Sequence, residues 1–430
     1  MQTIRADADG QNLELVTSTA EVDALNAEFY GAIPYPWPPL YFERLTDRRF
    51  WADMLDQDLG RRNAPVLPAE GARVWVAGCG TNQAVITAMM FPDARVVGTD
   101  ISAGSLEVAK RSAAQLGVGN LELRNESIHQ AGYAQEFDYV ICTGVIHHTG
   151  DPGAALASLA SAVRPAGVMQ LMVYNRYHRI MTTAFQKAMR VMMGGERYSY
   201  DDELALARRF VHHYAGPGAL APWLADQREA PDALLADKLI QPVEHSYTVE
   251  SLGRMAADAG LELLTPFPNS IDAARGTLSW EMEMGDAELQ RVYDALPDVQ
   301  RWQVTNLLLQ GDSPMLWFYM GHRDSPVPRV STRELCDAFL DGRYAAARTT
   351  RQVHMAAGPG GPYRAVPDQE SPFPARPQRG DAQKLFTAFE PGVPLRTTLN
   401  RLGIPTDDLR TVYRLRTLLA SSAFPFLRAA

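Results

Sequence analysis

Between residues 72 and 175, short apolar runs alternate with segments that have helical spacing. The apolar runs are RVWVAG, ARVVGTD, NLELRN, FDYVICTG and GVMQLMVYN, and helical stretches such as SAGSLEVAKRSAAQLG separate them. Strands that are apolar along their length, with helical crossovers between them, are typical of a parallel sheet covered on both faces. The alternation therefore predicts a doubly wound α/β domain.

The rest of the chain departs from this alternation in three places. Residues 1–71 predict an N-terminal lid and helical segment, and every strand identified from the sequence begins after residue 71. The α/β domain is expected over 72–322, with helical cap insertions at about 176–245 and 269–313. Residues 323–430 predict a mainly helical C-terminal domain, interrupted by a Gly/Pro-rich loop.

Composition excludes several classes of protein. The N-terminus has no apolar targeting segment, and no stretch approaches the ~20 apolar residues that span a bilayer, so we expect a cytoplasmic protein without a membrane partner. The three cysteines lie far apart, which predicts neither a disulfide framework nor a metal site. Residues 331–430 hold 14 Lys/Arg against 9 Asp/Glu, an excess typical of a solvated surface, so a nucleic-acid partner is not expected. No repeated pattern predicts an oligomeric state.

The first apolar run ends in an unusual glycine turn, VWVAGCGTNQ at residues 74–83. Dinucleotide-binding turns follow G-x-G-x-x-G, but the third glycine position holds Gln83, which weakens a hydride-transfer interpretation. Asp100 ends the second strand, 22 residues after Gly78, where a carboxylate can accept hydrogen bonds from both hydroxyls of a ribose. The turn and the carboxylate predict a nucleoside site, with or without a pyrophosphate.

Five segments occur in an order that resembles class I S-adenosylmethionine-dependent methyltransferases. VAGCGTN resembles the cofactor loop, GTDIS the ribose acid, NESI the adenine-flanking turn, FDYVICTGVIHH the fourth strand with its active-site end, and VRPAGVMQLMVYN the fifth strand. A PYP segment before the fold and EHSYTV after the cap resemble a bacterial subgroup. The resemblance implies a mostly parallel seven-stranded sheet and S-adenosyl-L-methionine as the cofactor. The contacts it implies are Gly78, Cys79, Gly80, Asn82, Gln83, Asp100, Ile101, Ser102, Ser105, Glu126, Ser127, Ile128, Thr143, Gly144, Val145 and His148.

The chain departs from the family pattern in two positions. Many members carry an acid inside the first strand, where this chain has Val76, and many carry Asp in the adenine turn, where it has Ser127. We expect Glu126 or the backbone of Ile128 to recognise adenine instead. Glycines in the turn allow the methionine part of the donor to approach the backbone closely.

Candidate acceptor-side residues follow the strands at the same edge. Methyl transfer requires alignment, a dry site and, where the nucleophile carries a proton, a base. Each candidate also has a structural interpretation: packing for the histidine pair, capping of the next helix for the asparagine. Because adjacent side chains are expected to point apart, the histidine pair does not predict a metal site. The candidates are His147, His148, Tyr174, Asn175, His178, Glu244 and His245.

The segment EFYGAIPYPWPPLYF, residues 28–42, has four prolines between 34 and 39 and cannot be an ordinary helix there. Its rings Tyr30, Tyr35 and Trp37 predict a lid that faces the cationic methyl donor, or alternatively an anchor that holds the N-terminus on the fold.

The pattern as a whole favours methyl transfer from S-adenosylmethionine to a small-molecule or short-peptide acceptor, in bacterial specialised metabolism. The alternative is an S-adenosylmethionine sensor or partner-binding module without catalysis, the partner being held by residues 331–430. An NAD-dependent oxidoreductase is the weaker enzymatic alternative.

Overall fold

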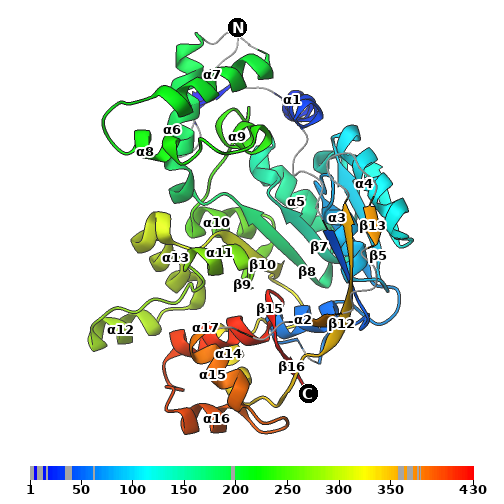
Figure 1. Ribbon diagram of the computed structural model, residues 1–430, viewed down its shortest axis with the longest axis vertical. Helices are drawn as coiled ribbons and strands as arrows, with labels where there is room; N and C mark the ends of the chain where they lie inside the picture. Colours follow the sequence, from blue (N-terminus) through cyan, green and yellow to red (C-terminus); the bar gives the residue numbers. More distant parts are fainter. Residues whose placement is uncertain are drawn as a thin grey trace.

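The computed structural model describes residues 4–6, 13–15, 18–33, 41–61, 63–194, 199–356, 363–365, 371–374, 377 and 379–430. Its centre is a seven-stranded sheet in the order β6-β5-β4-β7-β8-β10-β9, in which β10 alone runs antiparallel to its neighbours (Figure 1). This confirms the predicted doubly wound, mostly parallel fold. The strands are β4 (Arg73–Ala77), β5 (Arg95–Asp100), β6 (Leu121–Asn125), β7 (Phe137–Thr143), β8 (Val163–Val173), β9 (Leu261–Pro266) and β10 (Leu316–His322).

Helices cover both faces of this sheet because alternate strand residues point to opposite sides. Trp75 packs on one face, with α5 (Pro152–Ala162), α10 (Val249–Asp258) and α13 (Asp298–Leu309). Val74 and Val76 pack on the other, with helices from earlier in the chain. These are α2 (Phe50–Leu59), α3 (Gln83–Met90) and α4 (Ala103–Leu116).

Local signals in the sequence set several helix ends. Ser102 caps α4 by accepting a hydrogen bond from the backbone N–H of Ser105, and α4 ends at Gly117, whose φ is +65°. Pro165 and Gly167 suggest a turn before VMQLMVYN, but the structure has no separate turn there. This segment lies inside β8 as an irregular stretch, because Val163 and Val168 pair with residues only two apart on β7.

Both predicted insertions are present. The first forms α6 (Arg176–Met192), α7 (Tyr200–His213), α8 (Leu220–Ala225) and α9 (Asp232–Leu239), which share an apolar core with Phe29 of α1 (Thr19–Ala32) (Figure 1). The second forms α11 (Ser270–Arg275), α12 (Ala287–Asp294) and α13 between β9 and β10. Three short 3-10 helices complete the central part: η1 (Ile128–Gln130), η2 (Ile146–His148) and η3 (Gln310–Asp312).

All seven strands of the central sheet begin after residue 71, but the structure also has strands before that residue, which were not identified from the sequence. β3 (Tyr41–Leu45) pairs antiparallel with β12 (Thr349–Ala356), which also pairs with β13 (Tyr363–Ala365) and β14 (Ser371–Phe373). A partner about 300 residues away leaves no local signal beside β3. A short hairpin, β1 (Ile4–Ala6) with β2 (Leu13–Leu15), also lies before residue 71.

Four helices after residue 330 surround a core of their own: α14 (Thr332–Asp341), α15 (Gly380–Ala388), α16 (Leu395–Leu402) and α17 (Leu409–Ala420). They are joined by the short strands β11 (Tyr344–Ala346), β15 (Phe424–Pro425) and β16 (Leu427–Ala429). Within the described residues, none of the helices has the length and apolar character needed to span a membrane.

A buried polar junction joins this helical region to the sheet. The carboxylate of Asp58, at the end of α2, accepts hydrogen bonds from the Tyr319 hydroxyl of β10 at 3.0 Å and from the backbone N–H of Ser422 at 3.0 Å. Arg416 of α17 donates to the backbone oxygens of Gln57 and Asp58 at 2.9 and 2.7 Å. Three segments far apart in the chain therefore meet at one carboxylate.

Candidate active site

The glycine turn after β4 is tied to the end of β5 by Asp100. The backbone N–H of Gly80 donates to one carboxylate oxygen of Asp100, and the N–H of Ser102 donates to the other, both at 2.8 Å. Gly78 and Gly80 have φ of +66° and +54°, which glycine adopts without strain. Burial raises the pKa of the Asp100 carboxyl, and the two N–H donors oppose that shift. Each oxygen keeps a lone pair for a further donor, so the carboxylate fits the two hydroxyls of a ribose.

The glycine turn also touches the turn after β7. A Cβ on Gly78 would lie 2.5 Å from a methyl group of Val145, so only glycine allows this approach. Gln83, at the start of α3 beside Asn82, donates its side-chain amide to the Thr143 hydroxyl at 3.1 Å. The structure thus brings the predicted residues after β4 close to those after β7. Gly144, which lies between Thr143 and Val145, has a φ of +78°.

Two predicted cofactor residues are buried in the fold. The Cys79 thiol belongs to the core beneath the turn, and burial raises its pKa well above the usual value. Ser105 is 2% exposed and donates its N–H to the cap of α4. Their side chains support the loop.

The turn after β6 is held by its neighbours. Asn125 donates to the backbone oxygens of Asp100 and Ile101 at 2.8 and 3.0 Å, which joins the ends of β5 and β6. One oxygen of the Glu126 carboxylate accepts a hydrogen bond from the Tyr133 hydroxyl at 2.7 Å.

The next residues of this turn contact the N-terminal helix. The Ser127 hydroxyl donates to the Asp23 carboxylate of α1 at 2.5 Å. Ile128 is buried, and its backbone oxygen accepts from Ser158 at 2.7 Å. Asp23 carried no sequence signal, since its contact is 104 residues away.

Helix α1 lies against the carboxyl edge of the sheet (Figure 1). Asn26 donates to the backbone oxygen of His148 at 2.7 Å, and the Tyr30 hydroxyl donates to Asp237 of α9 at 3.2 Å. Phe29 is fully buried among the cap helices. Tyr35 and Trp37, the other two rings of the expected lid, lie outside the described residues.

A buried histidine pair follows β7. The ring centroids of His147 and His148 are 4.3 Å apart, so the expectation that their side chains point apart is wrong; the tight η2 turn brings the rings together. Tyr174, after β8, lies with its ring centroid 3.8 Å from that of His147. Burial is the main cause that lowers the pKa of both histidines, which keeps them neutral at pH 7.

The two histidines differ in their hydrogen bonds. Nδ1 of His148 lies 2.8 Å from the backbone oxygen of Val243. Because a carbonyl oxygen only accepts, a neutral His148 must carry its proton on Nδ1, which leaves a lone pair on Nε2. Both ring nitrogens of His147 are buried and have no hydrogen-bond partner among the described residues.

Two buried carboxylates complete the cluster. Asp237 accepts from the hydroxyls of Tyr30 at 3.2 Å and Tyr174 at 3.4 Å, and burial raises its pKa. Glu244 pairs with Arg179, whose Nε lies 2.7 Å from its carboxylate. The side chains of Arg179 and Glu244 are only 11% and 3% exposed, so the ion pair is buried.

Asp237 and Arg179 were missed by the sequence interpretation. The only signal for Asp237 is an acid inside the apolar run ALLADKLI.

The remaining predicted acceptor-side residues have structural contacts. Asn175 caps α6 and donates to the Ser313 hydroxyl at 2.9 Å, while His178 Nε2 lies 2.8 Å from the Ser313 backbone oxygen. Burial lowers the pKa of His178 to about 4. The backbone N–H of His245 donates to the His147 oxygen at 2.8 Å. Asn175 and His178 therefore hold the start of α6 in place, and for Asn175 this is the predicted capping role.

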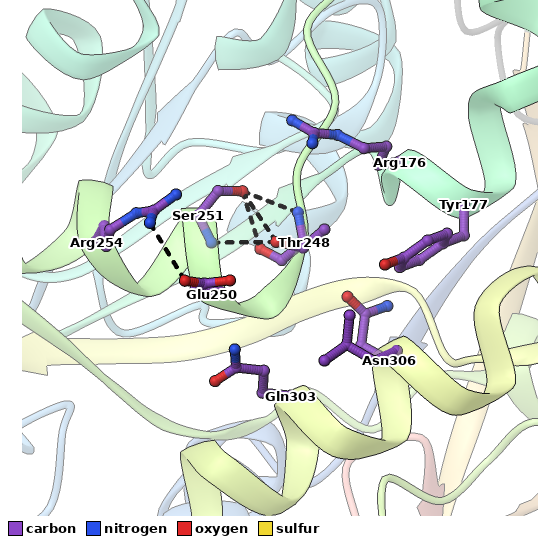
Figure 2. A pocket seen from close by; sticks show the side chains of 9 residues that line it. Arg176, Tyr177, Thr248, Glu250, Ser251, Arg254, Gln303 and Asn306 are labelled. Carbon is purple, nitrogen blue, oxygen red and sulfur yellow. Dashed lines mark hydrogen bonds and ion pairs between the residues drawn. The ribbon is translucent and has the colours of Figure 1, made fainter. Parts of the chain in front are cut away.

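A polar pocket of about 410 Å³ lies beside these residues, at the starts of α6 and α10 (Figure 2). The capping pair Thr248 and Ser251 forms part of its wall, and Arg254 pairs there with Glu250 at 3.2 Å. Among the described residues, no group of histidine, cysteine or acidic side chains has the arrangement of a metal site. The pocket is lined by Arg176, Tyr177, Thr248, Glu250, Ser251, Arg254, Gln303, Asn306 and Leu307.

Known proteins similar to this chain agree with the fold. A family model described as "Methyltransferase domain" matches residues 69–205. An uncharacterized protein of Synechococcus sp. is 29% identical over 267 residues, which cover 60% of this chain and 61% of that protein. The chain thus spans less than two thirds of the length of that relative. A ubiquinone biosynthesis O-methyltransferase of Paracidovorax citrulli is 28% identical over 209 residues, 46% of this chain and 77% of that enzyme.

A solved structure extends the likeness beyond the matched region. PKMT2 from Rickettsia typhi in complex with AdoHcy superimposes with a TM-score of 0.56 at 16% identity, over 92% of this chain and 77% of that chain. At this identity the likeness concerns the fold alone. The chain therefore contains a class I methyltransferase domain, of the class that takes its methyl group from S-adenosylmethionine.

Proposed function

We propose that this chain transfers a methyl group from S-adenosyl-L-methionine to a small-molecule or short-peptide acceptor in the cytoplasm. One observation carries the proposal. The turn fixed by Asp100 and the buried cluster of His148 and Asp237 lie at the same edge of one sheet, and α1 contacts both sides of that edge.

The residues at the glycine turn fit the parts of the donor. Asp100 would accept both ribose hydroxyls, because each of its oxygens is oriented by a backbone N–H and retains a lone pair. Asn82 and Gln83 would bind the amino-acid end, and the turn at Ser127 and Ile128 would bind adenine. When bound, the donor supplies a methyl group on a positively charged sulfur.

The buried cluster fits the acceptor side. His148 would take the proton that the acceptor loses, because its Nε2 keeps a lone pair and burial holds the ring neutral. Tyr174 and Asp237 would orient the acceptor, and α1 would exclude water from the edge. Asn175, His178, Glu244 and His245 would hold these groups in place.

The buried cluster and the names of the relatives support this class of acceptor. A hydroxylated small molecule is one member of the proposed class, since similar chains are named ubiquinone biosynthesis O-methyltransferases. We place the acceptor in bacterial specialised metabolism. We also propose that residues 323–430 form a mainly helical C-terminal domain that does not bind nucleic acid.

Calorimetry with S-adenosylmethionine and S-adenosylhomocysteine tests the first half of the proposal. No binding of either compound at millimolar concentration would refute it. Incubation with labelled methyl donor and a metabolite extract from the source organism tests the second half, with mass spectrometry of the labelled product. Binding without transfer of label would favour a sensor. His148→Gln should keep cofactor affinity while losing turnover, and equal loss of both would remove His148 from the role of base.

A further inference from the structure

The adenine turn of this chain has no acid at the position of Ser127, where the family resemblance leads one to expect Asp, and the neighbouring Glu126 accepts a hydrogen bond from Tyr133. Ser127 occupies the position, and its short side chain ends in a hydroxyl. In the folded chain, however, a carboxylate lies directly against that hydroxyl. It is Asp23 of α1, whose Oδ2 accepts from Ser127 at 2.5 Å.

The Ser127 hydroxyl fixes the orientation of this carboxylate. Its oxygen accepts a hydrogen bond from the backbone N–H of His129 at 3.2 Å, so its single proton is directed to Asp23. The second oxygen of Asp23, Oδ1, has no hydrogen-bond partner among the described residues. One oxygen of a positioned, half-buried carboxylate is therefore available to a donor at this turn.

The helix that carries Asp23 is held firmly at the site. Asp23, Asn26 and Tyr30 are spaced three and four residues apart and lie on one face of α1. Their partners run along the edge of the sheet, from Ser127 through the backbone of His148 to Asp237. Ser18 and Glu21 form a capping box at the start of the helix.

Close backbone contact also fixes the start of α1. A Cβ on Gly150, in the loop after η2, would lie 3.1 Å from the Cα of Thr19, so the helix packs directly on that loop. These contacts leave little freedom for Asp23 to move away from the turn.

We propose that Asp23 accepts a hydrogen bond from the 6-amino group of adenine, in place of the acid that the family pattern has at the position of Ser127. The inference rests on the proposed function and names a residue that selects the base of the cofactor. Because the same helix face contacts the buried acceptor-side cluster, a bound adenine also stabilises the position of α1 over that cluster.

The test compares binding of S-adenosylhomocysteine with its 6-oxo analogue, S-inosylhomocysteine, by calorimetry on the full chain. A carboxylate accepts from an amino group but repels a carbonyl oxygen, so the parent should prefer the adenosyl compound by about tenfold or more. In Asp23→Asn this preference should collapse, because the amide can donate to the 6-oxo group. Glu28→Gln, which removes an exposed acid from the same helix, is the matched control and should keep the parent's preference.

A double variant, Asp23→Ser with Ser127→Asp, moves the carboxylate back to the turn and should restore the preference for adenine. Equal affinity of the parent for both compounds would overturn the inference. So would an unchanged preference in Asp23→Asn, or an equal weakening of both compounds in that variant. Failure of the parent to bind S-adenosylhomocysteine at all would instead refute the proposed function. Melting curves show whether each variant is folded, and the double variant decides the matter if Asp23→Asn is not.

Discussion

Removal of the Asp100 carboxylate tests the site at its best-defined point. The carboxylate accepts from the N–H groups of Gly80 and Ser102 at 2.8 Å and is proposed to accept both ribose hydroxyls as well. A hydrogen bond to a charged group contributes about 1.5–3 kcal/mol. Asp100→Asn keeps one acceptor oxygen and should lose at least one such bond to the ribose, which lowers cofactor affinity by about 10- to 150-fold.

Asp100→Ala should lose more. It removes both proposed ribose contacts and also leaves two backbone donors of the loop without an acceptor, at about 1–3 kcal/mol for each donor that stays buried. A lower melting temperature should therefore accompany the loss of affinity in this variant. The Asn side chain has the same shape as Asp and keeps one of the two loop contacts, so the melting temperature of Asp100→Asn should fall between those of the parent and Asp100→Ala.

Calorimetry with S-adenosylhomocysteine and thermal unfolding of the same samples measure the two effects. Asp93→Ala is the matched control, because Asp93 is an acid shortly before β5 whose ion pair with Arg48 is exposed at the surface. Exposed ion pairs contribute roughly 0–1 kcal/mol, so this variant should bind like the parent. An Asp100→Ala protein that binds the cofactor as tightly as the parent would refute the assignment of the ribose site.

Three further predictions follow from buried contacts. Gly78→Ala should lower the melting temperature, since its Cβ would meet Val145 at 2.5 Å, and Val145→Ala in the same chain should restore part of the loss. Arg179→Met should reduce the free energy of unfolding by about 3–5 kcal/mol in denaturant titrations, because it leaves the buried Glu244 unpaired; a change under 1 kcal/mol, the value typical of an exposed pair, would contradict this. His147→Phe should gain stability relative to the parent between pH 7 and pH 5. The folded pKa of His147 lies below its unfolded value, so the parent loses stability as the pH falls below about 6.5; a constant difference across that range would count against a buried neutral ring.

Much of the fold could be predicted because its signals are local. The strands could be identified from apolar runs that end in glycine, aspartate or asparagine, and Ser102 and Gly117 are likewise local signals for the two ends of α4. The glycine turn and Asp100 could be identified for the same reason. Each lies at the end of a strand, so its position is evident from the neighbouring sequence alone, without knowledge of the residues it contacts.

Other parts of the site depend on contacts between distant residues. The sequence around Asp23 has only the signals of an ordinary capped helix, and only the packed fold brings Asp23 to Ser127. Asp237 stands in a helix of the cap, and its role depends on tyrosines from α1 and from the end of β8. The pairing of β3 with β12 likewise had no local trace.

The junction at Asp58 bears on how the chain can be divided. Its carboxylate is shared by α2, by Tyr319 in the sheet and by Ser422 after α17, and Arg416 closes the contact from the C-terminal side. A recombinant fragment that stops near residue 322 would retain all seven sheet strands, yet it would expose the end of α2 and strip β3 of its pairing strand. The helical region after residue 330 is therefore a cooperative unit with the sheet, and limited proteolysis should not release a stable catalytic core from this protein.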